Sequence, residues 1–281
     1  MLHREQLDYL LTCAYNAAVR AGAKILEIYN QDNFNINLKS DSTPITLADK
    51  EAHRLIKKYL NQTRIPLLSE EGRYLLFEER CNWDLFWLID PLDGTKEFIK
   101  RNGEFTVNIA LMIDNNPFLS VVYAPCFEKL YFSDKERGSF VKDDIKPDLN
   151  TEYTISEIYS DANRLPLVEK PNEPVKIVIS RSHLSPETYE FIEEIKKQHG
   201  EVEVLQSGSS LKFCMVAEGS ADYYVRTTTT YEWDTAAGDS VAISAGCSTH
   251  SIKDREVIKY NKENLENPYF YAKTKFINLL F

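Results

Sequence analysis

The chain has 281 residues, of which 43% are hydrophobic and 27% are charged, a composition typical of a globular protein with a substantial core. Its net charge of −10 argues against binding a nucleic-acid polymer, so an anionic ligand would need a locally positive site. Five scattered cysteines without a C-x-x-C pair predict reduced thiols in a cytoplasmic protein. No transmembrane segment is expected, while the sequence leaves open the oligomeric state and peripheral attachment at the cytoplasmic face of the inner membrane.

Two amphipathic helices are predicted near the start of the chain. Apolar residues recur at helical spacing over Glu5–Tyr29 and again over Leu47–Leu60, with a short strand and a turn expected between them at 36–44. Thr46 is the expected N-cap of the second helix, and Asp49 can complete a capping box with it. The pattern leaves open whether Asp49 serves only as this cap or also faces a metal site.

Two predicted strands end in carboxylates. The apolar run Ile65–Leu68 leads into Glu70, and the run Leu85–Ile89 leads into Asp90-Pro91-Leu92-Asp93-Gly94-Thr95. The proline lacks an N–H, so the second strand cannot simply continue, and the glycine permits a sharp bend. Carboxylates and the Leu92 carbonyl in one turn suit Mg²⁺, although the same residue types also form ordinary turns.

A mainly antiparallel sheet is predicted to complete the first half, followed by a connector at Lys142–Pro174 that contains a short strand at Glu152–Ile155. We place the domain boundary in this connector. It divides an N-terminal α+β half with the acidic site, residues 1–145, from a C-terminal α/β half, residues 146–281. The strands expected in the first half are Phe105–Ile113, Phe118–Tyr123, Leu130–Phe132 and Glu136–Val141.

The second half alternates strands and helices, which predicts an α/β arrangement. Polar residues stand where these elements begin or end: His183 follows a strand, Ser209 and Lys212 lie in a Gly-Ser turn at a helix start, and Asp234 opens another helix. Each also has a plain structural interpretation, as a loop histidine or a helix N-cap. The expected elements are Val175–Ser180, Ser185–Gln198, Glu201–Leu205, Leu211–Glu218, Ala221–Val225 and Asp234–Ala245.

These motifs together resemble a known family. Glu70-Glu71, Asp90–Thr95 and Trp233–Gly238 are similar to the three signatures of the inositol monophosphatase superfamily of Mg²⁺-dependent, Li⁺-sensitive phosphatases. The run Asp90–Ala110, with Ser180–His183 and Gly208–Cys214, resembles the bisphosphate nucleotidases of that superfamily. The resemblance spans nearly the whole chain. It implies an α/β fold, a layered α-β-α-β-α sandwich with the active site between the halves.

The resemblance also implies a metal site and a catalytic set. Two Mg²⁺ ions are expected, with a third left open near Asp49, and Asp90 would bridge the first two. Glu70 and Thr95 would orient and help deprotonate the attacking water, with Asp49 close by. The implied metal ligands are Glu70, Asp90, the Leu92 carbonyl, Asp93 and Asp234.

The implied substrate is adenosine 3′,5′-bisphosphate, cleaved to AMP and phosphate, with adenylyl-sulfate 3′-phosphate as a second substrate in sulfur assimilation. Lys212 and Arg226 would bind the phosphate that is not cleaved, and His183 would support the base. The implied substrate-binding residues are Glu70, Leu92, Asp93, Gly94, Thr95, His183, Ser209, Lys212, Arg226 and Asp234.

Two alternatives remain at this stage. An inositol or sugar monophosphatase of the same fold would leave Lys212 and Arg226 without a second phosphate to bind. A non-catalytic regulator that binds Mg²⁺ or a nucleotide would have no need of Glu70 and Thr95, which argues against it.

Overall fold

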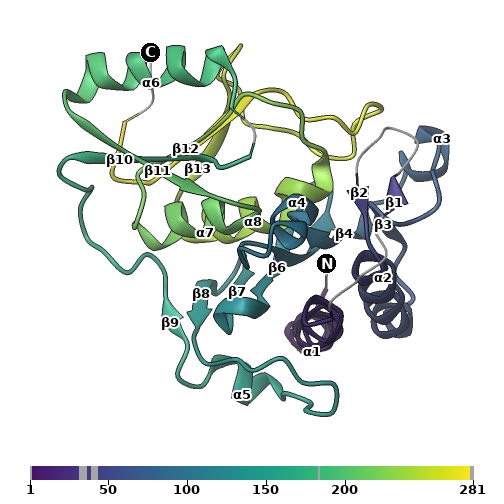
Figure 1. The fold of residues 1–281 in the computed structure, drawn as a ribbon. Coiled ribbons are helices and arrows are strands. Elements are labelled where there is room, and N and C mark those ends of the chain that lie inside the picture. Colours follow the sequence, from purple (N-terminus) through teal and green to yellow (C-terminus); the bar gives the residue numbers. More distant parts are fainter. Residues whose placement is uncertain (1, 32–36, 39–43, 183, 279–281) are drawn as a thin grey trace.

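The computed structural model describes residues 2–31, 37–38, 44–182 and 184–278. Helices and sheets alternate in layers in Figure 1, with a larger sheet and a smaller sheet separated by a pair of helices. The predicted α-β-α-β-α sandwich is therefore confirmed. The helices of these layers are α1 (Arg4–Tyr29) and α2 (Leu47–Leu60) outside the larger sheet, α7 (Leu211–Glu218) and α8 (Glu232–Ser244) between the sheets, and α6 (Pro186–His199) outside the smaller sheet.

The larger sheet runs in the order β3-β4-β5-β6-β7-β8-β9. Strands β3 and β4 pair in parallel and the remaining neighbours are antiparallel, as predicted for the first half. The strands are β3 (Leu67–Ser69), β4 (Leu85–Asp93), β5 (Thr106–Ile113), β6 (Asn116–Ala124), β7 (Lys129–Asp134), β8 (Gly138–Lys142) and β9 (Asn163–Arg164).

The smaller sheet runs in the order β11-β10-β12-β14-β13. The first three of these strands are parallel, as the alternating pattern predicted, whereas β14 pairs antiparallel with both its neighbours. The sequence reasoning assigned no strands beyond residue 245, so it missed the last pair. The strands are β10 (Val175–Ser180), β11 (Val202–Ser207), β12 (Tyr223–Arg226), β13 (Ser248–Ser251) and β14 (Phe270–Lys273).

Burial on both faces of β4 explains its unbroken apolar run. Trp87 and Ile89 pack with α1 and α2 in one core, and Phe86 and Leu88 pack with α7 and α8 in the next. Successive strand residues point to opposite faces, so a strand between two helical layers needs apolar residues at every position. The apolar run therefore places β4 between two helical layers.

Short elements join these layers. Asn37–Leu38 (β1) pairs with Pro44–Ile45 (β2), while the rest of the strand and turn predicted at 36–44 lies outside the described residues. Short helical segments are α3 (Phe77–Arg80), α4 (Thr95–Ile99), α5 (Ile155–Tyr159), η1 (Asn61–Thr63) and η2 (Pro125–Phe127).

The strand predicted at Glu152–Ile155 is wrong. Helix α5 begins there instead, because Thr154 and Glu157 form a capping box: the Thr154 N–H donates to Glu157 Oε2 at 2.8 Å, and the Glu157 N–H donates to Thr154 Oγ1 at 3.4 Å. The spacing T-x-x-E in the sequence was the signal for this start. Strand β9, which also follows residue 145, pairs with β8 of the larger sheet. The domain boundary stays a prediction.

The turn between β5 and β6 is shorter than predicted. Asp114 and Asn115 alone form the loop, with φ values of 49° and 60°, and β6 begins at Asn116 rather than at Phe118. Two consecutive residues with positive φ are typical of a tight hairpin whose twist matches the flanking strands.

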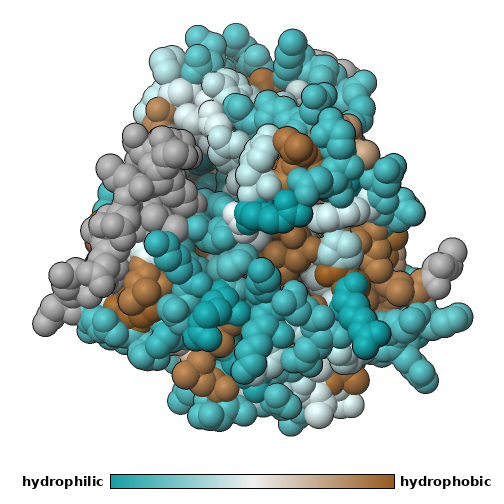
Figure 2. Space-filling model, turned by 90° about the vertical axis from the view of Figure 1, so that its right-hand side faces the viewer, coloured by the Kyte–Doolittle hydropathy of each residue, from teal (hydrophilic) through white to brown (hydrophobic). Residues whose placement is uncertain are grey.

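Hydrophilic side chains dominate the face of the molecule shown in Figure 2, and hydrophobic residues appear there in separate groups. Among the described residues, no helix is both long enough and apolar enough to cross a membrane.

Gly238 allows α7 and α8 to approach closely between the sheets. A Cβ at this position would lie 2.7 Å from Cδ2 and 2.8 Å from Cβ of Phe213, which is fully buried in the same core. Helix α7 carries Lys212 and α8 carries Asp234, so this contact sets the spacing of two predicted site residues.

We expect Gly238→Ala to lower the free energy of unfolding by about 1–2 kcal/mol. Overpacking against Phe213 should cost about 1–3 kcal/mol, and the better helix propensity of alanine should recover only part of it. Thermal unfolding measures the change, with Ser244→Ala near the end of the same helix as a nearly neutral control. An unchanged or more stable Gly238→Ala protein would show that the two helices can separate freely.

Candidate active site

The carboxylates of β4 flank a bulge at the end of the strand, which Asp93 closes. Asp90 pairs with Asn108 and Asp93 pairs with Thr106, so two residues of β4 oppose one residue of β5 between them. The strand does not continue regularly at Pro91, as expected, and reaches Asp93 only through the bulge, where a residue without an N–H is tolerated. The bulge turns both carboxylates toward the same region, and Asp90 Oδ1 accepts the Leu92 N–H at 3.0 Å.

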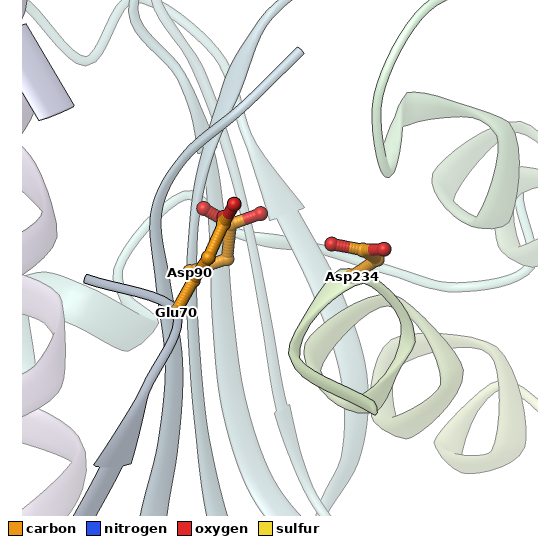
Figure 3. Close-up of side chains that lie close together, drawn as sticks. All are labelled: Glu70, Asp90 and Asp234. Carbon is orange, nitrogen blue, oxygen red and sulfur yellow. The ribbon is translucent and has the colours of Figure 1, made fainter. Parts of the chain in front are cut away.

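Glu70, Asp90 and Asp234 come together from three elements. Ser69 pairs with Ile89 across the parallel strands β3 and β4, so the next residues, Glu70 and Asp90, lie side by side. Asp234 reaches them from the first turn of α8, as Figure 3 shows. Each residue offers one carboxylate oxygen, and these oxygens all lie within 4.8 Å of one another. Hard oxygen donors at this spacing fit a divalent cation such as Mg²⁺.

Helix α8 begins earlier than predicted, at Glu232, with Tyr231 as its N-cap. Asp234 is therefore the third helical residue and not the N-cap, and its Oδ2 accepts the Tyr231 N–H at 2.8 Å. This bond holds one oxygen of the carboxylate at the helix start.

Burial and mutual repulsion make this cluster electrostatically unfavourable without a cation. Burial, followed by the nearby Glu70, Asp93 and Asp234, raises the pKa of Asp90 well above its usual value. Burial and the charges of Asp93 and Glu70 raise the pKa of Asp234 in the same way. A bound cation would remove both effects, because it favours the charged form of each carboxylate.

Asp93 has a more favourable setting. Burial raises its pKa, while Lys212 and the hydrogen bonds from Ser210 and Asn108 oppose that shift. Ser210 Oγ donates to Asp93 Oδ2 at 2.9 Å, and Asn108 Nδ2 donates to the same oxygen at 3.3 Å. These bonds orient the carboxylate from the neighbouring strand β5 and from the N-cap of α7.

Asp49 is both a helix cap and a hydrogen-bond partner of Thr95. Its Oδ2 accepts the Thr46 N–H at 2.7 Å, which confirms the predicted capping box, and its Oδ1 accepts Thr95 Oγ1 at 3.1 Å. Thr95 Oγ1 also lies 3.5 Å from the Leu92 carbonyl oxygen. Asp49 is only 2% exposed, and burial raises its pKa. The capping box is thus only part of the role of Asp49 in the structure.

Lys212 supplies a buried cation on the other side of the site. Its Nζ donates to the Ser209 carbonyl at 2.6 Å and lies 5.2 Å from the centre of the Tyr224 ring. Burial and the nearby Arg226 lower its pKa to about 8. An anionic ligand beside Lys212 would favour its charged form.

A single cavity of about 180 Å³ adjoins both groups. Arg226 lines it while donating through Nε and Nη2 to the Thr228 and Thr229 carbonyls at 3.3 and 3.2 Å. Ser209 also lines it, with a buried Oγ that has no hydrogen-bond partner among the described residues. Ser210 rather than Ser209 is the N-cap of α7. The lining includes the predicted residues Asp93, Gly94, Thr95, Ser209, Lys212, Arg226 and Asp234.

His183 alone among the predicted site residues lies outside the described residues. Sequence reasoning missed Asn108, Ser210 and Tyr224. A lone asparagine within the apolar run of β5 was a usable signal, since buried polar residues need partners. Ser210 adjoins the predicted Gly-Ser turn, but nothing local distinguishes Tyr224 from an ordinary core tyrosine.

Comparisons with known proteins agree with this geometry. The model of the Inositol monophosphatase family matches residues 6–277. The chain is 40% identical to the 3′(2′),5′-bisphosphate nucleotidase CysQ of Salmonella typhimurium over 256 residues, covering 90% of this chain and 95% of the relative. The same identity holds for the Escherichia coli CysQ over 267 residues, with coverage of 94% and 98%.

Solved structures give the same result. The crystal structure of CysQ from Bacteroides thetaiotaomicron superposes with a TM-score of 0.87 at 44% identity, covering 95% of this chain and 98% of that one. An inositol monophosphatase from Anabaena, at 21% identity, shares the fold with a TM-score of 0.68 and coverage of 96% and 92%. The chain therefore belongs to the inositol monophosphatase family.

Proposed function

We propose that this protein is a Mg²⁺-dependent 3′(2′),5′-bisphosphate nucleotidase that hydrolyses adenosine 3′,5′-bisphosphate to AMP and phosphate. One observation carries the proposal: a single cavity is lined by the carboxylates of Asp93 and Asp234 and by the cations of Lys212 and Arg226. A substrate with two phosphates can use both groups at once. The CysQ relatives bear the name of this activity.

The donor set supports a metal site of the predicted kind. In this proposal Glu70, Asp90 and the Leu92 carbonyl would hold one Mg²⁺, Asp90, Asp93 and Asp234 would hold a second, and Asp49 would mark a place for a third. Bound Mg²⁺ supplies positive charge for the phosphoryl oxygens and activates the attacking water.

The remaining chemistry falls to side chains and backbone groups of the cavity. Glu70 and Thr95 orient the water that attacks phosphorus, and the 3.1 Å bond from Thr95 Oγ1 to Asp49 Oδ1 gives the threonine proton an acceptor. The N–H groups of Gly94 and Thr95 bind the phosphate being cleaved. The water oxygen forms a new bond to phosphorus as the bond from phosphorus to the 3′ oxygen breaks. That oxygen takes a proton from solvent water and leaves as the 3′-hydroxyl of AMP, while the new P–O bond stays in the released phosphate.

Lys212 and Arg226 bind the other phosphate, with Ser209 beside them and His183 supporting the base. Adenylyl-sulfate 3′-phosphate carries the same 3′-phosphate and is a second substrate in this proposal. A role in sulfur assimilation in the cytoplasm follows, and the free cysteines at all five positions agree with a reducing compartment.

Replacing Asp93 tests the metal assignment. We expect Asp93→Asn to reduce kcat by about 100-fold or more, because it removes a charge from the second metal position while an amide of the same shape can still accept from Ser210. Steady-state phosphate release measures the loss, and thermal unfolding confirms that the variant is folded. Asp143→Asn, at an exposed carboxylate, is the matched control. Strong residual turnover in folded Asp93→Asn protein contradicts the assignment.

Cation binding should stabilise the fold. Because the buried carboxylates repel one another, saturating Mg²⁺ should raise the thermal midpoint, and a ligand at 100 times its Kd contributes about 2.7 kcal/mol. Melting curves with Mg²⁺ and with NaCl of equal ionic strength measure the effect. Asp234→Asn should show a smaller Mg²⁺ effect than the wild type. A midpoint that does not respond to Mg²⁺ argues against a preformed metal site.

Substrate preference separates a nucleotidase from a general phosphatase. Lys212→Ala and Arg226→Ala should each raise KM for adenosine 3′,5′-bisphosphate by about 10- to 100-fold, since a charged hydrogen bond contributes about 1.5–3 kcal/mol. Inositol 1-phosphate, which has one phosphate, should be affected far less. Lys259→Ala, at an exposed lysine, serves as the control. Equal losses on both substrates, or a wild-type preference for the inositol ester, would favour the inositol or sugar monophosphatase alternative.

A further inference from the structure

We propose that Glu104 and Arg181 form an inter-half clamp that positions the turn Gly208–Ser210 for binding the phosphate that is not cleaved. Neither residue lines the cavity, so both are positioning residues. The inference rests on the proposed nucleotidase function and adds a support for the cationic side of the site.

The clamp joins residues far apart in the sequence. Arg181 Nε and Nη2 donate to Glu104 Oε2 and Oε1, each at 2.8 Å, in a bidentate pair. The Gly208 N–H donates to Glu104 Oε2 at 2.9 Å, and Arg181 Nη2 also donates to the Gln206 carbonyl at 2.9 Å. Glu104 precedes β5 in the larger sheet, whereas Arg181 follows β10 and Gly208 follows β11 in the smaller one. The carboxylate thus holds the ends of two parallel strands against the first half.

Gly208 permits this close approach. A Cβ there would lie 2.7 Å from the Glu104 carbonyl oxygen and 2.7 Å from Cγ of Glu97. Ser182 strengthens the same contact, because its Oγ donates to Glu97 Oε1 at 2.6 Å and accepts from Lys100 Nζ at 2.8 Å. The turn is therefore packed directly on helix α4 and on the loop that follows it.

The turn Gly208–Ser210 connects the clamp to the residues that line the cavity. The Ser209 carbonyl accepts Lys212 Nζ at 2.6 Å, and Ser209 is held at φ 46°, a region that non-glycine residues rarely adopt. Ser210 Oγ donates to Asp93 Oδ2 and accepts from Asn108 Nδ2 at 2.8 Å. The bonds to Asp93 and Asn108 anchor Ser210 independently of the clamp. Loosening the clamp should therefore displace Gly208, Ser209 and Lys212 more than the metal side.

Glu104 supports the turn mainly through its hydrogen bond from the Gly208 N–H rather than through its ion pair with Arg181. Arg181 is 41% exposed as a side chain, and an exposed ion pair usually contributes little. The buried N–H of Gly208 is different, because it loses its carboxylate acceptor if Glu104 is truncated. Arg181 acts through Glu104 by fixing the orientation of that carboxylate.

The test compares KM with kcat in a graded series. Glu104→Ala should raise KM for adenosine 3′,5′-bisphosphate about tenfold while kcat changes by less than about twofold, as expected for the loss of a charge-assisted bond that supports binding only. Glu104→Gln should have a smaller effect, because its amide oxygen can still accept the Gly208 N–H. Arg181→Ala should lie between them. KM for inositol 1-phosphate should stay within about twofold in every variant, since that ester leaves the second phosphate position empty.

Arg255→Ala is the matched control. It removes another partly exposed arginine of the second half, whose Nη2 lies 3.2 Å from Glu194 Oε2 in an ion pair that does not line the cavity. The KM of this variant should equal that of the wild type. If the Glu104 variants melt at a lower temperature with unchanged KM, the clamp is only structural and the inference is wrong. The same holds if KM rises equally for adenosine 3′,5′-bisphosphate and for inositol 1-phosphate. A wild-type enzyme that prefers inositol 1-phosphate would instead overturn the proposed function, and the role of the clamp with it.

Discussion

Repulsion among buried carboxylates is the constraint on which this structure depends. Asp90 is almost fully buried, and its neighbours Glu70, Asp93 and Asp234 are charged groups of the same sign. Folding the chain around them has a local electrostatic cost, since each buried charge without a partner costs several kcal/mol. Such a cluster persists only because well-packed elements on all sides hold it, and a cation offers the natural compensation.

Those elements come from different layers of the sandwich. The parallel pair β3 and β4 places Glu70 beside Asp90, and the bulge in β4 turns Asp93 toward the same region. Helix α8 packs between the sheets and presents Asp234 from its first turn. Rigid strands and helices, rather than long loops, thus carry the acidic side chains, which limits how far the cluster can relax to escape its own repulsion.

The positive charge of Lys212 is likewise held in place by the packed elements around it. Lys212 is buried on α7, and its Nζ is held by the Ser209 carbonyl and the face of Tyr224. Ser210 links this side to the acidic side, because its Oγ donates to Asp93 and lies 3.0 Å from the Asp234 carbonyl oxygen. Acidic and basic groups therefore face one cavity from two sheets and two helices, and small turns such as Gly208–Ser210 set their separation.

The sequence by itself determined much of this. Helical periodicity located α1 and α2, the start signal Ser185-Pro186-Glu187 located α6, and the unbroken apolar run located β4. The motifs around Asp90 and Asp234 indicated the family and the acidic residues. These features are local: a capping box, a turn residue or a strand period depends on residues a few positions apart. The helix at Ile155–Tyr159 was mispredicted. The sequence indicated that β4 cannot simply continue at Pro91, but it did not show that a bulge carries the strand to Asp93.

Only the tertiary structure decided which residues meet. No local pattern shows that Asn108 of β5 and Ser210 before α7 bind the same carboxylate, or that Thr95 bonds to Asp49 across 46 positions. Nor does any pattern show that Glu104 accepts the N–H of Gly208, 104 residues away. Such contacts depend on how the layers stack and on the space that a glycine leaves between them. The sequence therefore determined the chemistry available to the site, and the packing of the sandwich decided its geometry.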